Sequence, residues 1–165
     1  MTAQVQEKLI LEGQELGMAF CPPLPKDSSQ IVAVKSRSVR KAIEEGSLPQ
    51  YIMSTACWRG YIGIWEIRSG RLYLNDVVGR YKKASPEALF ANWFSGVLRV
   101  PKGKILRAVN IGFASVHERE LHIKIDRGVV VAEQEIDNSS KHLDRNELAS
   151  RSLPGSENRF EGDDF

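Results

Sequence analysis

Two segments of alternating apolar and polar residues, 58–68 and 71–78, flank the dipeptide Ser69-Gly70 and constrain the fold more than any other feature. Glycine adopts positive φ at no steric cost, as a two-residue hairpin turn requires, so the segments predict an antiparallel β-hairpin. Large apolar side chains fall on both faces of its first strand, which predicts that both faces are covered. One face carries Trp58, Ile62 and Ile64, and the other carries Arg59, Tyr61, Trp65 and Ile67.

Shorter β segments surround this hairpin. We predict a hairpin from 8–12 and 14–20, strands at 31–34, 97–100, 105–113 and 121–125, a turn at 101–104, and a last strand at 129–131 after the turn Arg127-Gly128.

Two short helices are also predicted. Ser38 can cap a helix that ends at Glu45, before Gly46. Ser85 and Pro86 favour the start of a second helix over 85–95, along which apolar residues recur at helical spacing. The fold class is therefore mainly β with one or two short helices (β-rich α+β): an antiparallel sheet or sandwich of about eight strands, with the 85–95 helix packed against it.

The chain divides into one domain and a tail. We expect a single β-rich domain over residues 1–136, with a Pro-rich and basic insertion at 22–48. Residues 137–165 contain few large apolar groups and many polar and acidic ones, a composition that cannot offset the entropy lost on ordering. The tail is therefore predicted to be disordered.

No motif of a compartment signal, membrane span or cofactor site is visible. The N-terminus lacks a basic region followed by an apolar stretch, and no apolar run is long enough for a membrane helix, so we expect a cytoplasmic, soluble protein with no membrane partner. Cys21 and Cys57 are interpreted as reduced, buried thiols. We expect no cofactor and no metal, because His117, His122 and His142 lack metal-ligand spacing.

Charge is distributed unevenly behind a formal net charge of +2. Residues 79–107 hold seven basic groups and one acid, whereas residues 132–165 hold nine acids and four basic groups. The basic part is either a solvated set of turn residues, visited by the acidic tail, or a surface for an acidic or nucleic-acid partner with Tyr81 or Trp93 as a stacking group.

Catalytic chemistry is weakly indicated. Glu118 and Glu120 share a strand face, as paired carboxylates for acid–base work would, but surface charge is the preferred interpretation. With Glu66 they are the candidates if the protein is an enzyme of unknown substrate. Whether it is an enzyme stays open, and the interpretation leans against it.

The block Ser54-Thr55-Ala56-Cys57-Trp58-Arg59-Gly60-Tyr61-Ile62-Gly63-Ile64-Trp65-Glu66-Ile67 resembles one in a family of small, uncharacterised bacterial proteins. The resemblance continues through 70–74, 92–103, 112–116 and 128–131, and covers roughly residues 7–132. It implies a small stand-alone partner of a bacterial toxin or effector.

The leading functional hypothesis is a non-enzymatic protein-binding inhibitor, specifically a cytoplasmic immunity-type protein that blocks a cognate bacterial toxin or effector. The alternatives are a nucleic-acid-binding protein that uses the basic segment 80–107, or an enzyme. A homo-oligomer through an edge strand stays open. The candidate binding residues are Arg59, Tyr61, Trp65, Glu66, Arg80, Lys82, Lys83, Arg99, Lys102 and Lys104.

Overall fold

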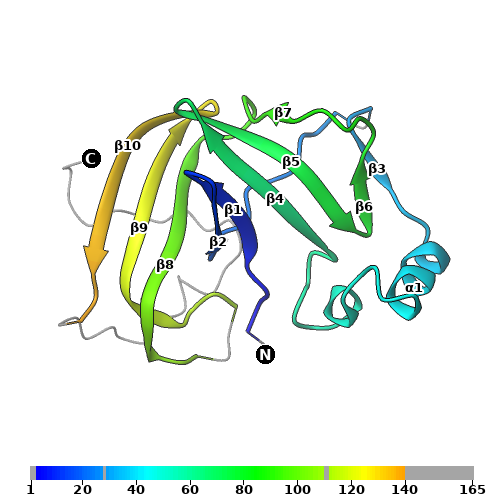
Figure 1. The fold of residues 1–165 in the computed structure, drawn as a ribbon, viewed down its shortest axis with the longest axis horizontal. Coiled ribbons are helices and arrows are strands. Elements are labelled where there is room, and N and C mark those ends of the chain that lie inside the picture. Colours follow the sequence, from blue (N-terminus) through cyan, green and yellow to red (C-terminus); the bar gives the residue numbers. More distant parts are fainter. Residues whose placement is uncertain (1–2, 28, 110–111, 140–165) are drawn as a thin grey trace.

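The computed structural model describes residues 3–27, 29–109 and 112–139. Within them the chain is mainly β, with one α-helix and one short 3-10 helix, which confirms the predicted fold class (Figure 1). In chain order the elements are β1 Glu7–Leu11, β2 Gln14–Met18, β3 Ile31–Ala33, α1 Ser36–Glu44, the 3-10 helix η1 Gln50–Met53, β4 Tyr61–Arg68, β5 Arg71–Gly79, β6 Tyr81–Lys83, β7 Leu89–Phe90, β8 Gly96–Arg107, β9 Val116–Asp126 and β10 Val129–Asp137.

The large sheet has the strand order β2-β1-β4-β5-β10-β9-β8, with β7 paired to β5. Its pairs are antiparallel except β1 with β4, which run parallel, so the sheet is mixed where a purely antiparallel one was predicted. The two ends of the sheet approach each other, because the amide of Ala19, just after β2, donates to the carbonyl of Arg99 in β8 at 2.8 Å. The sheet thus curls around one interior.

That interior holds the main core. Trp65, Leu72, Leu74, Leu98 and Ile123 are completely buried there. Each fully buried side chain of this size contributes roughly 1.5–3 kcal/mol to stability. The predicted central hairpin is confirmed, and both residues of its turn have positive φ, 51° at Ser69 and 71° at Gly70.

A smaller layer lies at one end of the large sheet. β3 pairs antiparallel with β6 in a separate two-stranded sheet, and α1 and η1 follow β3 along the chain (Figure 1). A second core cluster joins this layer to the β4–β5 hairpin through Val39 of α1, Ile52 of η1 and Ile62 of β4. The segment interpreted as an insertion is therefore packed structure at its C-terminal half.

The predicted helix over 85–95 is wrong. This segment contains turns and the short strand β7, which pairs with β5. Its apolar residues meet tertiary partners instead of sharing a helix face: Ala91 donates its amide to Leu72 O, and the indole of Trp93 donates to Pro23 O at 2.8 Å. Long-range pairing outweighed a good local helix start, as tertiary context often does.

The predicted turn at 101–104 and the separate strand at 105–113 are also wrong. β8 runs unbroken through Pro101, which lies opposite Glu120 of β9, and register shifts follow between Lys102 and Arg107. Because the carbonyl of Arg99 points away from β9 to Ala19, Pro101 two residues later also directs its backbone nitrogen away from β9. The missing N–H of proline therefore costs no ladder bond.

Two further expectations concern the C-terminal boundary of the domain and the presence of a membrane-spanning helix. β10 extends to Asp137, and Asn138 is buried with its side-chain amide donating to His117 O at 3.1 Å, so packed structure continues past the predicted boundary at 136. The rest of the predicted tail, residues 140–165, lies outside the described residues. Among the described residues, no helix is long and apolar enough to span a membrane.

Candidate interaction surface

Trp58 and Arg59 occupy a tight turn just before β4. The amide of Gly60 donates to Cys57 O at 3.0 Å and closes this turn, and the amide of Trp58 donates to the side chain of Gln4 at 2.9 Å. Strand β4 thus begins at Tyr61, later than the predicted strand, and Trp58 is not a core residue. Its side chain is 49% exposed, which is rare for an indole and typical of a binding anchor.

Arg80 connects this turn to the smaller layer. Its amide donates to Gly60 O at 2.9 Å, and its carbonyl accepts the amide of Val34 at 2.8 Å. Its side chain lies across Gly60, where an added Cβ would stand 2.5 Å from Arg80 Cδ. The φ of Gly60 is +73°, so both backbone geometry and space call for glycine here.

Aromatic and cationic side chains continue from the turn onto β6. The rings of Tyr61 and Tyr81 meet edge to face with centroids 5.8 Å apart, and the Arg59 guanidinium lies 5.8 Å from the Tyr61 centroid. Tyr81 is 38% exposed, and its neighbour Lys82 is exposed opposite Val32 of β3. We call this set the hairpin-end surface: Trp58, Arg59, Tyr61, Arg80, Tyr81 and Lys82.

A buried ion pair anchors the turn from below. Glu7 Oε1 of β1 lies 3.4 Å from Arg59 Nε, and Arg59 Nη2 donates to Val5 O at 2.9 Å. The Glu7 carboxylate also accepts the amide of Gly63. Burial raises the pKa of Glu7 to about 7, against the lowering effect of the Arg59 charge and the Gly63 amide. The ion pair thus ties the turn to β1 across the only parallel strand pair among the described strands.

The groups around this pair are held in their neutral forms. Burial raises the pKa of the Cys21 thiol, the pKa of the Tyr61 phenol and the pKa of the Cys57 thiol above their ordinary values. Both cysteines are free and buried, as predicted. A protonated, buried thiol is a poor nucleophile, so this cluster favours structure over covalent chemistry.

Six of the predicted binding residues lie outside the hairpin-end surface, and four of them are buried or belong to β8. Trp65 is completely buried in the main core, and Arg99 is buried with Nη2 donating to Phe113 O. Lys102 and Lys104 belong to β8, which stands apart from β6 (Figure 1). The basic segment 80–107 is therefore continuous in sequence but divided between two places in the fold.

Glu66 and Lys83 have structural partners. Glu66 Oε1 pairs with Arg68 at 2.9 Å and accepts the Asn75 amide at 3.1 Å. Lys83 Nζ donates to Asn75 O at 2.9 Å and to Glu87 O, and partial burial lowers the pKa of its ammonium group. Asn75 is the extra residue of a β-bulge, so Lys83 satisfies a carbonyl that the bulge takes out of the ladder.

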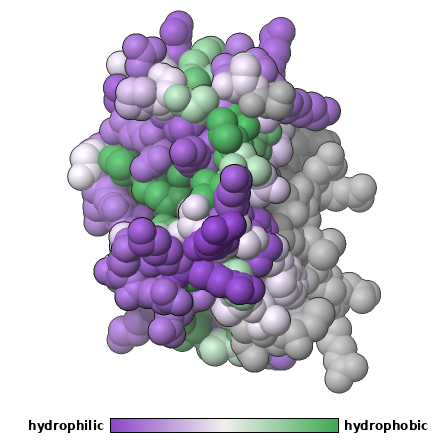
Figure 2. Space-filling model, turned by 90° about the vertical axis from the view of Figure 1, so that its right-hand side faces the viewer, coloured by the Kyte–Doolittle hydropathy of each residue, from purple (hydrophilic) through white to green (hydrophobic). Residues whose placement is uncertain are grey.

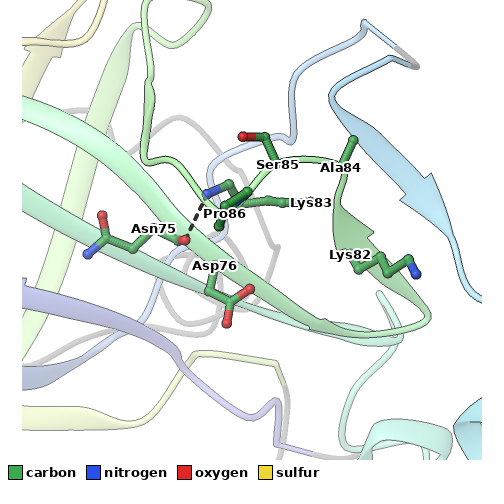
Figure 3. Close-up of a pocket in the computed structure, with 7 residues that line it drawn as sticks. All are labelled: Asn75, Asp76, Lys82, Lys83, Ala84, Ser85 and Pro86. Carbon is green, nitrogen blue, oxygen red and sulfur yellow. Dashed lines mark hydrogen bonds between the residues drawn. The ribbon is translucent and has the colours of Figure 1, made fainter.

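A shallow pocket of about 410 Å³ adjoins Lys83, lined by Asn75, Asp76, Lys82, Lys83, Ala84, Ser85 and Pro86. Figure 3 shows that Asp76 and Lys82 point away from one another and that Lys83 reaches Asn75 instead of the open space. A catalytic or small-ligand site needs polar groups that converge on one point. This pocket does not have that arrangement.

The carboxylates considered for catalysis do not form a pair. Glu120 is buried and lies 2.9 Å from His122 Nε2, so its interpretation as surface charge is wrong, while Glu118 packs beside Gly103. The described residues contain no group of three or more His, Cys, Asp or Glu arranged to hold a metal ion, and His142 lies outside them.

Sequence reasoning missed the cations of α1. Lys35, Arg37, Arg40 and Lys41 are all exposed, and β3 brings their helix beside β6. Figure 2 views the molecule from this side and shows hydrophilic side chains around an apolar region. Val32 of β3 is 39% exposed. The run of four cations in seven residues was a visible signal, but only the β3–β6 pairing assigns it to this surface.

Comparison with protein-family models, with curated proteins and with solved structures finds no match to the chain.

Proposed function

We propose that this chain is a non-enzymatic protein-binding inhibitor, of the immunity type, that blocks a cognate bacterial toxin or effector through the hairpin-end surface. The half-exposed Trp58 carries the proposal, in a turn whose Gly60 lies against the Arg80 side chain. Trp, Tyr and Arg are the residue types that dominate binding energy at protein interfaces, because they bury large area and direct hydrogen bonds at once.

The contacts that hold the Trp58 turn in place also favour a binding role. The Gly60–Cys57 hydrogen bond, the Gln4 contact and the Glu7–Arg59 ion pair fix the turn before any partner arrives. A preorganised anchor loses little conformational entropy on binding, which raises affinity. The inhibitor acts sterically: Trp58 fills a pocket on the toxin, and the surrounding cations and tyrosines exclude water and substrate from the toxin's active site.

The test uses the full chain, tagged, in nuclease-treated lysate of the native host. We expect one protein to co-purify in stoichiometric amount with the wild type, to be lost with Trp58→Ala, and to be retained with Ile105→Ala, which removes another exposed apolar side chain, on β8. The purified chain then inhibits the activity or toxicity of that protein at one-to-one ratio.

Three results would overturn the proposal. A partner bound equally by Trp58→Ala would place the interface elsewhere. A captured protein whose activity is unaffected would exclude inhibition. Material lost on nuclease treatment would show a nucleic-acid partner instead.

A further inference from the structure

Several charges of helix α1 oppose its dipole, although Lys41 in the last turn favours it. Arg37 lies in the first turn, where the helix end is positive and where no acidic residue is present, while Glu44 and Glu45 lie at the C-terminal end, which is negative. The N-cap residue is Lys35, and its side chain makes no capping hydrogen bond. Each such placement costs a few tenths of a kcal/mol or more in an exposed helix.

The cations of α1 also stand close to one another. Arg37 and Lys41 are four residues apart, so they face the same side of the helix, and Arg40 is adjacent to both. The one ion pair that the described residues show within α1 joins Lys41 to Glu45 at 3.8 Å. Like charges at this spacing destabilise a helix, so the arrangement does not serve the stability of the isolated chain.

The fold extends this cluster to the hairpin-end surface. The carbonyl of Arg80 accepts the amide of Val34, immediately before Lys35, and Lys82 lies opposite Val32 on the paired strand. Five exposed cations, Lys35, Arg37, Arg40, Arg80 and Lys82, are therefore carried by α1, β6 and the residue that precedes each of them, segments that the β3–β6 pairing joins. When several unfavourable charge placements share one surface, a binding partner is expected to compensate for the stability that they cost.

We infer that α1 and β6 form a cationic extension of the hairpin-end surface, and that the partner bound there presents a carboxylate-rich protein surface. The inference rests on the proposed function and names the chemistry of its partner. Arginine and carboxylate form two parallel hydrogen bonds, so Arg37, Arg40 and Arg80 suit Asp and Glu side chains. Opposite charge also accelerates association and rejects wrong partners.

The acids around this surface favour a protein over a nucleic acid. Glu44 and Glu45 end α1, and Asp76 lines the same pocket as Lys82. A phosphodiester chain carries one negative charge at every nucleotide and would meet these carboxylates, whereas a protein can place acidic and basic groups opposite a mosaic of charges.

The test measures binding of two labelled probes to the purified full chain by fluorescence polarisation: a short Glu-rich peptide that contains aromatic residues, and an oligo-dT of matched charge. We expect the peptide to bind at low salt, and its affinity to fall toward ~0.15 M salt. The double variant Arg37→Gln/Arg40→Gln should weaken it by about tenfold. The matched control Lys102→Gln/Lys104→Gln removes the same charge from β8 and should leave the affinity unchanged.

Each contrary outcome is decisive. Equal weakening by both double variants would show an effect of net charge alone, and tighter binding of the oligonucleotide would assign the surface to nucleic acid. Absence of peptide binding to the wild type would overturn the carboxylate partner. Since neither probe assay needs the host protein, these failures are distinct from failure to capture and inhibit a partner through Trp58.

Discussion

Glu7 and Arg59, 52 positions apart in the sequence, form a buried ion pair in which Oε1 of the carboxylate lies 3.4 Å from Nε of the guanidinium. The Glu7 side chain is completely buried and that of Arg59 is 10% exposed. A pair taken out of water in this way is costly to break, because one charge is left without its partner.

Removal of the cation tests this relationship. Arg59→Met should destabilise the protein by up to about 3–5 kcal/mol at alkaline pH. The loss should shrink toward neutral pH, because the Glu7 pKa rises further without the Arg59 charge and the carboxyl is then neutral. Arg119→Ala, which breaks the exposed pair with Glu135, should cost less than about 1 kcal/mol. Urea denaturation measures both, and equal effects would show that the Glu7–Arg59 pair is not desolvated in solution.

Stability should depend on pH through Glu7. Its pKa is about 7 in the folded chain and near 4.5 in the unfolded one, so between these values the folded state binds more protons. Stability therefore falls as pH rises from 4.5 to 7, by about 3 kcal/mol in total. Glu7→Gln should remove this slope. Denaturation midpoints of both chains across the same pH range measure it, and parallel curves would contradict the assignment.

Gly63 should tolerate no side chain. A Cβ there would stand 2.5 Å from Trp65 Nε1 and 3.1 and 3.2 Å from the two Glu7 oxygens, all of them buried. Gly63→Ala should cost about 1–3 kcal/mol through overpacking, as thermal unfolding would show. In Gly17→Ala the new methyl meets mainly the flexible end of Gln6, so a loss as large there would argue against this explanation.

Lys83 and Lys82 are neighbours with different environments. Lys83→Met removes hydrogen bonds to two backbone carbonyls and should destabilise the protein by roughly 0.5–1.5 kcal/mol. Lys82→Met, at an exposed position, should change stability by less than about 0.5 kcal/mol. Chemical denaturation of the two variants gives their free energies of unfolding. Equal values would show that the Lys83 hydrogen bonds do not stabilise the packing of β6 on the bulge of β5.

The three tryptophans should differ in access to a quencher. Trp58 is half-exposed, Trp65 is completely buried, and Trp93 packs against Trp65 with centroids 6.4 Å apart. Acrylamide should therefore quench Trp58 most, and Trp58→Phe should remove most of the quenchable emission while leaving the unfolding temperature almost unchanged. Strong quenching that persists in this variant would show that Trp58 is not the exposed indole.

Local patterns were reliable where neighbouring segments pair. Ser69-Gly70, Arg127-Gly128 and the break at Gly13 each mark a hairpin that the structure contains, because a turn and its two flanking strands are encoded within about twenty residues. The helix at 85–95 was mispredicted by the same local reasoning, since its apolar residues find partners on β5 and at Pro23 that no local pattern contains.

For the candidate site too, residue type was readable from local sequence, whereas burial depended on long-range packing. Residue type alone singled out Arg59, Tyr61, Arg80 and Lys82 as binding residues. Arg80 and Lys82 are exposed, whereas the Arg59 side chain is 10% exposed and holds the turn through its ion pair with Glu7. Burial separated Trp65 from Trp58: the alternation had predicted that both faces of the strand are covered, but Trp58 is half-exposed while Trp65 is completely buried. Residues 57–60 form a turn, so Trp58 lies before β4 and the alternation of that strand does not apply to it. No spacing rule in the sequence reveals this turn.

The sequence by itself determined the β-rich class, the hairpins and the end of α1 before Gly46, since each depends on the conformational preferences of a few adjacent residues. The start of α1 was mispredicted, because its N-cap is Lys35 and Ser38 lies within the helix. Tertiary structure alone decided which side chains reach solvent. Parallel pairing of β1 with β4 buries Glu7 under Arg59, and pairing of β3 with β6 brings the segment that leads into α1 beside Arg80. Both pairings join segments about fifty residues apart, and their free energy comes from burial and hydrogen bonds that exist only once the chain is folded.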